Sequence, residues 1–502
     1  FRVRGSGAIS VKIMDTINRI ETLFNPKSIA IIGASKTIGK WGFKFVLHPI
    51  KGGYQGKIYP VNPSGGELLG QKIYTSVEEI PEPVDLAFIL LPPQKVADAI
   101  RSCGKVKIPT CVVITAGFKE IGAEGDRLEA DIKTAADAAD VAMVGPNCAG
   151  MLSAHPYNLH SMMQPAFPPP GQISILSQSG NVAGSLLHML DRLDIGISRC
   201  VSVGNQAQLN TTDFLEYMID DAQTSVVMAY IESVADGSRF MDVVRRLTKG
   251  KPLLVVKGGQ TDTGTRAAKS HTGAIAGSAD VFASMCRQCG IIQFKDVEDM
   301  IDAATAFISL PLPQGNRVGI VANGGGWGVL TADACIEAGL DVVELSSETL
   351  ELLDKRLPPW WNRQNPVDMV AGMSRGAFFK ATEILCQSNQ IDSIIIQGFG
   401  YGNANANVLE PYADEDGMDF TQYKADTLNS DIRGLNFILD LVKKYQKPIL
   451  QASEYTVGAD KDQNEAILEF RKNNMLIFPT AQRPADVLAR LVRYSHYKEQ
   501  IN

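Results

Sequence analysis

One histidine in this chain lies in a loop whose composition suits covalent phosphate chemistry. His271 stands in the stretch 266–274 beside Ser270, Thr272 and Gly273, among residues that are otherwise mostly small. An imidazole surrounded by small residues and backbone amides is suited to carry a phosphoryl group, because a ring nitrogen acts as the nucleophile and amides bind the anion. The plainer alternative is a loop histidine at a subunit contact.

A carboxylate partner for this histidine is predicted at Glu232. This residue directly follows the apolar run 226–231, at the expected carboxyl edge of a parallel sheet. A carboxylate there can accept a hydrogen bond from one imidazole nitrogen and fix the tautomer whose other nitrogen attacks phosphorus. An ion pair between Glu232 and Arg239 is the alternative.

A predicted anion site follows the apolar run 173–176. Ser177, Gln178, Ser179 and Gly180 come next and open an apolar helix. The free amides and the positive end of that helix would stabilise a phosphoryl group. Ordinary capping of the helix by serine explains the same residues.

A second anion site is predicted in the turn 33–40, which joins the first expected strand to a helix. Gly33, Gly39 and the helix start form a phosphate cradle. Because Ser35 occupies the second glycine position of the dinucleotide pattern, and no Walker A motif is present, we expect a pyrophosphate-bearing ligand other than NAD. Lys40 is either a point charge on a phosphate oxygen or a solvated lysine. Other loops at the same edge contain small residues and proline, and they would line a long, thin ligand. These loops lie at Asn62, Pro93 and Gly117.

The elements that must position these loops are strands that alternate with helical stretches along nearly the whole chain. This alternation predicts parallel α/β architecture. The expected strands fall into three sets: 29–32, 57–61, 86–91, 111–115 and 141–144; then 173–176, 200–203, 226–231 and 253–257; then 318–322, 342–345, 393–397 and 449–451. Proline-bearing connections at 165–170 and 311–314 suggest domain boundaries, and the similarity of 172–180 to 317–325 suggests that the second and third domains are related.

Composition excludes several classes of protein. The chain has 502 residues, 45% hydrophobic and 21% charged, with a formal net charge of −7. Nothing basic indicates nucleic-acid binding, and no apolar run reaches the roughly 18 residues of a membrane span, so we expect a cytoplasmic protein. The eight cysteines are expected to be reduced, and Cys286 and Cys289 to pack inside or beside a helix at 281–288 rather than bind metal. Cys148 is interpreted as a small wall residue.

Two segments are expected to lie outside the folded domains. Residues 1–21 are interpreted as an upstream extension or an artificial fusion remnant, with a natural start near Met14. The stretch 400–431 is polar, acidic and helix-poor, which predicts a surface excursion; a segment that contacts a partner or substrate is the alternative.

Taken together, these motifs resemble a known family over residues 22–490. The chain is similar to the alpha subunit of ADP-forming acyl-CoA synthetases and, more distantly, of succinyl-CoA synthetase. The resemblance is carried by Ser270-His271-Thr272-Gly273, Gly145-Pro146-Asn147-Cys148, Ser177-Gln178-Ser179-Gly180 and Asn365-Pro366-Val367-Asp368. It implies three consecutive parallel-sheet domains: a Rossmann-like CoA-binding domain at 22–164, a flavodoxin-like domain with the phosphohistidine at 165–312, and a second flavodoxin-like domain at 313–502.

The resemblance also implies a reaction and its residues. Acyl-CoA and phosphate give acyl phosphate and CoA; His271 then takes the phosphoryl group, releases the organic acid and passes phosphate to ADP. By similarity, Glu232 orients His271 and the amides of 177–180 hold its phosphate, with no metal site on the chain itself. Residues expected to contact CoA are Gly33, Ser35, Gly39, Lys40, Asn62, Pro93, Gly117 and Asn147.

Two departures from the family pattern bear on the expected site. Gln208 stands where relatives have an aspartate, which puts local geometry or substrate choice in question, and Trp327 stands where relatives have a small residue or proline. ADP, ATP and Mg are expected on an ATP-grasp beta subunit in a heterotetramer, since no such domain is recognised in this chain. The alternative function is a non-catalytic sensor or regulatory subunit that binds CoA or acyl-CoA.

Overall fold

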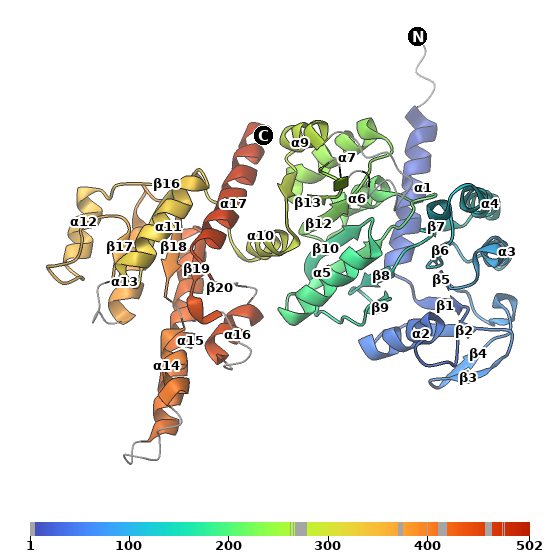
Figure 1. The fold of residues 1–502 in the computed structure, drawn as a ribbon, viewed down its shortest axis with the longest axis horizontal. Helices are drawn as coiled ribbons and strands as arrows, with labels where there is room; N and C mark the ends of the chain where they lie inside the picture. Colours follow the sequence, from blue (N-terminus) through green and yellow to red (C-terminus); the bar gives the residue numbers. More distant parts are fainter. Residues whose placement is uncertain are drawn as a thin grey trace, which may run out of the picture. The chain divides into compact units, whose positions relative to one another are not determined.

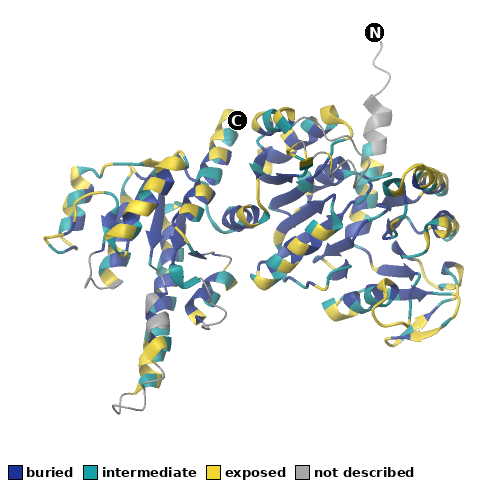
Figure 2. Cartoon of the chain, in the orientation of Figure 1, coloured by how far each residue is buried: buried dark blue, intermediate teal, exposed yellow. Residues whose placement is uncertain are grey.

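The computed structural model describes residues 6–261, 263–264, 266, 279–369, 375–398, 400–409, 419–456, 464–473, 475 and 477–501. For residues 6–12, 375, 401 and 403–405 it describes only the backbone. The chain divides into two compact units, residues 1–300 and 301–502. Figures 1 and 2 show that each unit is built on buried sheets flanked by helices, which confirms the predicted α/β class.

The first sheet of residues 1–300 is entirely parallel in the described part of the chain. Its strand order is β2-β1-β5-β6-β7. The strands are β1 (Ser28–Ile32), β2 (Lys57–Val61), β5 (Leu86–Ile89), β6 (Thr110–Val113) and β7 (Ala142–Val144). The accompanying elements are α2 (Trp41–Gly52), α3 (Pro93–Lys105), α4 (Ala123–Ala139) and the hairpin β3 (Gly66–Leu68) with β4 (Gln71–Ile73). Strands buried on both faces read as continuous apolar runs, which is why the sequence revealed them.

The second sheet lies in the same unit and has the order β14-β13-β12-β10-β11-β8-β9. Its strands are β8 (Gly150–Ser153), β9 (Leu159–Met162), β10 (Pro170–Ser177), β11 (Ile197–Ser202), β12 (Val226–Ile231), β13 (Leu253–Lys257) and β14 (Ile292–Phe294). Its helices are α5 (Gly180–Arg192), α6 (Thr211–Asp220), α7 (Gly237–Gly250) and α9 (Ala279–Gln288). The sequence did not predict β8 and β9, which are antiparallel and extend this sheet from positions before residue 165.

The N-terminal helix α1 (Ser6–Phe24) corrects one expectation. Residues 1–21 were expected to lie outside the fold, yet Ile20 is fully buried in the same hydrophobic core as Leu23 and Phe24. The Arg19 guanidinium donates to the carbonyl oxygen and the carboxylate of Asp140 at the end of α4, at 2.6 and 2.7 Å. The last turns of α1 therefore belong to the folded unit.

Residues 301–502 form a parallel sheet of order β16-β15-β18-β19-β20, with β17 paired to β15. The strands are β15 (Arg317–Ala322), β16 (Asp341–Val342), β17 (Val367–Asp368), β18 (Ser393–Gln397), β19 (Ile449–Ala452) and β20 (Ile477–Phe478). The helices are α10 (Val297–Ser309), which begins just before this unit, α11 (Gly325–Glu337), α12 (Ser347–Asp354), α13 (Arg375–Gln387), α14 (Tyr401–Leu409), α15 (Phe420–Tyr445), α16 (Glu465–Lys472) and α17 (Gln482–Ile501).

The stretch 400–431 is not helix-poor, so that prediction is wrong. It contains α14 and the first half of α15, and the two helices pack against each other. Leu435 and Ile438 of α15 are buried in the core of this unit, which explains why a helix forms in a sequence rich in polar residues. The acidic residues 414–416 lie outside the described residues.

Candidate functional site

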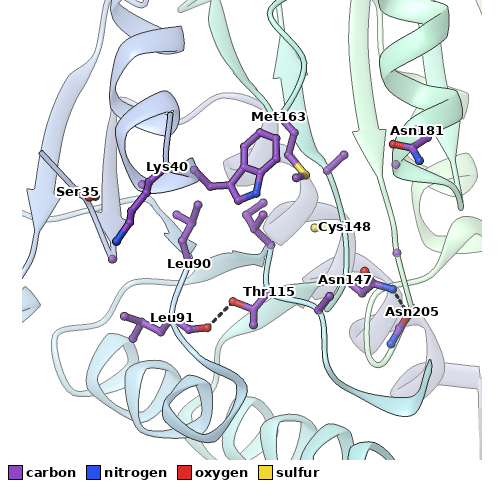
Figure 3. A pocket seen from close by; sticks show the side chains of 18 of the residues that line it. Ser35, Lys40, Leu90, Leu91, Thr115, Asn147, Cys148, Met163, Asn181 and Asn205 are labelled. Atoms are coloured by element: carbon purple, nitrogen blue, oxygen red, sulfur yellow. Dashed lines mark hydrogen bonds between the residues drawn. The ribbon is translucent and has the colours of Figure 1, made fainter. Parts of the chain in front are cut away.

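A cavity of about 920 Å³ opens where strands from both sheets of residues 1–300 end (Figure 3). Loops that follow β1, β2, β5, β6, β7, β10 and β11 all contribute to its wall, so the chemistry-bearing loops meet at the carboxyl ends of parallel strands. The wall residues are Gly33, Ala34, Ser35, Gly39, Lys40, Trp41, Gly42, Asn62, Leu90, Leu91, Ile114, Thr115, Ala116, Asn147, Cys148, Ala149, Met163, Gln178, Ser179, Gly180, Asn181, Gly204 and Asn205.

The turn after β1 forms one end of this cavity. Gly33 has a φ of +98°, and a Cβ placed on it would lie 2.5 Å from the carbonyl oxygen of Leu90. Only glycine fits such a position, because a side chain would both strain the backbone and collide with the neighbouring strand end. Ser35 Oγ accepts from the Thr37 amide at 3.2 Å, and Lys40 precedes the first residue of α2. The turn therefore presents backbone amides, with Lys40 directly before the first residue of α2.

Some of the remaining residues predicted to contact CoA line the cavity, and others support the loops around it. Asn62 lines the cavity, but its side chain donates to the Ala34 carbonyl at 2.8 Å and accepts from the Ser64 amide at 2.9 Å, so it braces the loops. Pro93 and Gly117 do not line the cavity, and they lie close to each other. The Gly117 amide donates to Glu120 at 2.6 Å.

The start of α5 forms the opposite end of the cavity. Ser179 caps the helix, since its hydroxyl accepts from the Val182 amide at 3.4 Å, which confirms the predicted serine cap. The amides of Gly180 and Asn181 have no acceptor within the helix, as for any first turn, and both residues line the cavity. A Cβ on Gly180 would lie 2.8 Å from that of Ala149, so the close approach of the two loops requires glycine here.

Ser177 and Gln178 support this helix start rather than extend its binding surface. Ser177 is buried, does not line the cavity, and its hydroxyl donates to the Ser179 carbonyl at 2.7 Å. The Gln178 side chain accepts from the amides of Glu232 and Ser233 at 2.8 and 2.9 Å, and it donates to Thr211 at 3.0 Å. Its donors are already used within the protein, so Gln178 ties α5 to the end of β12.

Glu232 directly follows β12 and is buried, with 6% of its surface exposed. Its neighbour Tyr230 has a pKa raised to about 12 by burial and by the negative charge of Glu232. Lys257 at the end of β13 donates to the Glu232 carbonyl at 2.8 Å, and burial lowers the pKa of that lysine. Arg239, the alternative partner, forms its ion pairs with Asp213 and Glu216. His271 lies outside the described residues.

The cysteines behave as packing residues. Cys148 is a wall residue with 3% of its surface exposed, its thiol donates to the Val113 carbonyl at 3.2 Å, and burial raises its pKa to about 12. A thiol with that pKa is almost entirely protonated near neutral pH, so it is a poor nucleophile. Cys286 and Cys289 are buried as expected.

The sequence did not predict a polar cluster around Asn205. The side-chain nitrogen Nδ2 of Asn205 donates to Glu120 and Glu129, both at 2.8 Å. The side-chain oxygen Oδ1 of Asn205 accepts from Asn147 at 3.3 Å (Figure 3). Glu120 also accepts from the Gly117 and Phe118 amides, and these bonds, working against burial, lower its pKa below the ordinary 4.5. The cluster joins the loops after β6, β7 and β11.

Gln208 and Trp327, which depart from the family pattern, have different surroundings. Gln208 accepts from the Met143 amide at 2.6 Å and donates to Asp137 at 2.7 Å, so it ties β7 to α4 away from the cavity. Trp327 lies in the first turn of α11 and is half-buried. In the same unit, Asn365 accepts from the Ile320 amide at 2.9 Å and donates to the Val318 carbonyl at 2.8 Å, which fixes that motif against β15.

Comparison with known proteins agrees with this arrangement. Three family models match in sequence order: a CoA binding domain at 27–154, a succinyl-CoA ligase like flavodoxin domain at 170–307 and a ligase-CoA domain at 318–406. The acetate–CoA ligase [ADP-forming] II subunit alpha of Pyrococcus furiosus is 38% identical over 376 residues, which are 75% of this chain and 81% of that protein. The chain belongs to the ADP-forming acyl-CoA synthetase family.

Two further relatives of this family give the extent of the match. The acetate–CoA ligase [ADP-forming] of Methanocaldococcus jannaschii is 41% identical over 69% of this chain, but the match spans only 48% of that relative. The solved structure of dinucleotide forming acetyl-coenzyme A synthetase 1 from Ca. Korarchaeum cryptofilum, in complex with phosphate and ADP, matches with 31% identity and a TM-score of 0.81. That match covers 96% of this chain and 98% of the other chain.

One of the three family models is a CoA binding domain, which indicates CoA as a ligand of this chain. In the part of the chain that the structure describes, no helix is long and apolar enough to cross a membrane. Among the same residues, no group of three or more His, Cys, Asp or Glu side chains is arranged to hold a metal ion.

Proposed function

We propose that this chain interconverts acyl-CoA, phosphate and ADP with an organic acid, CoA and ATP, through an acyl phosphate and a phosphohistidine at His271. The observation that supports the proposal is one cavity whose wall includes the turn 33–40 at one end and the start of α5 at the other. A CoA ester held at the turn 33–40 would lie in the same cavity as phosphate held at the start of α5.

In the proposed reaction, the described residues position the reactants and stabilise negative charge. A phosphate oxygen attacks the thioester carbonyl, the carbon–sulfur bond breaks, and the thiol leaves with a proton. The Gly180 and Asn181 amides face the cavity at the positive end of α5, where they would stabilise negative charge without reorganising. His271 then takes the phosphoryl group from acyl phosphate and releases the acid.

We assign supporting roles to the other predicted site residues. Gly33, Ser35, Gly39, Lys40 and Asn147 line the cavity and are proposed to contact CoA. Asn62, Pro93 and Gly117 are proposed to shape the surrounding loops, and Ser177 to Gly180 to hold phosphate through the helix start. Glu232 is proposed to orient His271. Under this assignment the chain comprises a CoA-binding domain at 22–164, a phosphohistidine domain at 165–312 and a third domain at 313–502.

We propose that ADP, ATP and Mg are held by an ATP-grasp beta subunit in a heterotetramer. The proposal is supported by the Pyrococcus relative, which is named as a subunit alpha. The relative from Methanocaldococcus, about twice as long as the segment it shares with this chain, instead carries further sequence in one polypeptide.

Protein phosphorylation tests the proposal directly. The chain is mixed with its ATP-grasp subunit, Mg and ATP labelled at the γ-phosphate, and the label on the chain is tested with acid and base. We expect a label that is stable to base and labile to acid, and we expect none on His271→Ala. Absence of label on the unsubstituted chain would exclude the phosphohistidine and favour the non-catalytic sensor.

The Glu232→Gln variant tests the orienting role separately. Loss of a properly aligned partner for the imidazole is expected to slow labelling by about 10²-fold. Glu232→Gln keeps the shape of the side chain, the bond that the residue 232 amide donates to Gln178 and the bond that its carbonyl accepts from Lys257, so folding should be retained. Labelling at the native rate would remove Glu232 from the mechanism.

A further inference from the structure

A buried lysine lies at the carboxyl end of β13, beside the strand that ends before Glu232. Lys257 is the last residue of β13, and 5% of its surface is exposed. β12 and β13 are neighbouring parallel strands, and Ile231 pairs with Lys257 (Figure 1). A lysine is seldom buried to this extent unless its ammonium group has partners. Its partners therefore indicate its role.

The ammonium group of Lys257 connects the ends of these two strands. Its Nζ donates to the carbonyl oxygen of Glu232 at 2.8 Å and to that of Gly258. The centre of the Phe282 ring on α9 lies 5.7 Å from Nζ, a position that favours a cation. Burial lowers the pKa of this lysine, whereas the negative charge of Glu232 raises it. Lys257 therefore binds the backbone of Glu232 and also interacts electrostatically with its carboxylate.

The side chain of Glu232 packs against the backbone that follows β13. A Cβ placed on Gly258 would lie 3.2 Å from Cγ of Glu232 and 2.6 Å from the hydroxyl oxygen of Tyr230. Glycine permits this close approach, because it has no side chain of its own. The Gly258 amide also donates to the Ile231 carbonyl at 2.9 Å. Lys257 thus holds both the backbone of Glu232 and the backbone that packs on its side chain.

Lys251 offers a comparison at the other end of the same strand. It lies two residues before β13, and its Nζ donates to the carbonyl oxygens of Met218 and Asp221, both at 2.7 Å. Burial lowers the pKa of this lysine too. The amino end of a parallel strand lies away from the edge where open α/β sheets bind ligands. The same pattern of bonds therefore supports the fold at Lys251, whereas at Lys257 it acts on Glu232.

We propose that Lys257 is a positioning residue for phosphoryl transfer, which holds Glu232 in the orientation that accepts from His271 and balances the negative charge there. This inference rests on the proposed function, because it takes His271 as the phosphoryl carrier and Glu232 as its partner. A phosphoryl group on the imidazole would add negative charge near a carboxylate. A fixed cation beside that carboxylate stabilises this state without reorganising.

Rates of labelling in the complete complex test this role. The chain is mixed with its ATP-grasp subunit, Mg and ATP labelled at the γ-phosphate, for the native protein, Lys257→Met and Lys251→Met. Methionine keeps most of the apolar stem and removes the charge and the donors. We expect Lys257→Met to be labelled at least about 10-fold more slowly, as for a displaced catalytic group, and Lys251→Met to remain within about 2-fold of the native rate.

The pH dependence of labelling separates charge from packing. Beside Glu232 lie the hydroxyl of Tyr230 on β12, the ammonium of Lys257 and the side-chain amide of Gln178 before α5. Of these three groups, only Lys257 can carry a positive charge. Loss of a cation raises the pKa of a nearby carboxylate or imidazole, so the acid limb of the rate profile should move up by about 0.5–1 pH unit in Lys257→Met. Lys257→Arg keeps the charge and should retain the native acid limb.

A second measurement tests the inference without phosphorylation. Diethyl pyrocarbonate modifies the neutral imidazole, and mass spectrometry gives the rate of this reaction at His271 as a function of pH. The midpoint should be higher in Lys257→Met than in the native chain and in Lys251→Met, because loss of a nearby cation favours the imidazolium. Urea unfolding shows whether each variant folds. Lys257→Gln, which keeps a neutral donor, takes the place of Lys257→Met in both measurements if the methionine variant does not fold.

The proposed function and this inference fail in different ways. If label appears but its rate and acid limb are unchanged in the folded, uncharged variant, the inference is wrong and the phosphohistidine stands. A slower rate with an unmoved acid limb and an unmoved His271 midpoint would show a role in packing alone and would also overturn it. If the native chain acquires no label, the phosphohistidine is wrong. The His271 midpoint then decides, since a raised midpoint supports the placement of Lys257 and an unchanged one excludes it.

Discussion

The Glu120→Gln substitution probes the polar cluster that joins the loops around the cavity. The Glu120 carboxylate accepts from two backbone amides and from the Asn205 side chain, at 2.6, 3.1 and 2.8 Å. A glutamine can accept the backbone bonds with its oxygen, but its NH2 group then faces the Asn205 NH2 group. Turning Asn205 over does not help, because its oxygen would face Glu129.

The expected loss of folding free energy follows from the two NH2 groups that face each other. One poorly paired polar group costs about 1–3 kcal/mol, and the lower end applies because Glu120 is only half-buried. A loss of about 1 kcal/mol, with a urea m value of about 3 kcal/mol/M, lowers the unfolding midpoint of the full chain by about 0.3 M at pH 7. Glu67→Gln, at an exposed position in β3 of the same unit, serves as the control and should not move the midpoint.

The pH dependence of this difference has a defined sign. Hydrogen bonds to Glu120 outweigh its burial and lower its pKa below 4.5, so its contribution to stability is fully present above that value. The contribution disappears as the pH falls through the lowered pKa of the folded state. The midpoints of the native chain and Glu120→Gln should therefore differ at pH 7 and converge at acid pH. A difference that does not shrink as the pH falls below 4.5, or no difference at pH 7, would refute the reasoning.

Two other substitutions separate close packing from chemistry at the cavity wall. Gly180→Ala should reduce labelling at least 10-fold, because the new Cβ would lie 2.8 Å from that of Ala149 and displace the start of α5; phosphorylation rates measure this. Cys148→Ser should keep the labelling rate within about 2-fold, because the buried thiol has a pKa of about 12 and does not act as a nucleophile; a loss of two orders of magnitude would contradict this.

The sequence predicted most buried parallel strands because such strands are continuous apolar runs between turn residues. It did not predict β8 and β9, since short strands on the antiparallel side of a mixed sheet depend on pairing partners distant in the chain. It assigned 400–431 to an irregular excursion because local propensity is weak there, whereas α15 is stabilised by packing of Leu435 and Ile438. The last turns of α1 were not predicted, because their burial depends on a core formed with residues distant in the chain.

The candidate site was predictable where it depends on strand ends and not where it depends on distant contacts. The turns after β1 and β10 were identified because a glycine-containing loop that opens a helix has a local signature. Met163 carries no such signature, since it lines the cavity only because β9 joins the second sheet. The Asn205 cluster likewise needs three loops from two sheets, which no local pattern shows.

The same cluster explains how two sheets can share one cavity. Asn205 follows β11 of the second sheet, whereas Glu120 and Asn147 follow β6 and β7 of the first. Their hydrogen bonds hold the loops of both sheets together, and Gly180 at the start of α5 packs closely on Ala149 after β7. Contacts between loops therefore connect the two helix starts that line the cavity. Changes in the cluster should therefore affect the transfer step more than the binding of either ligand alone.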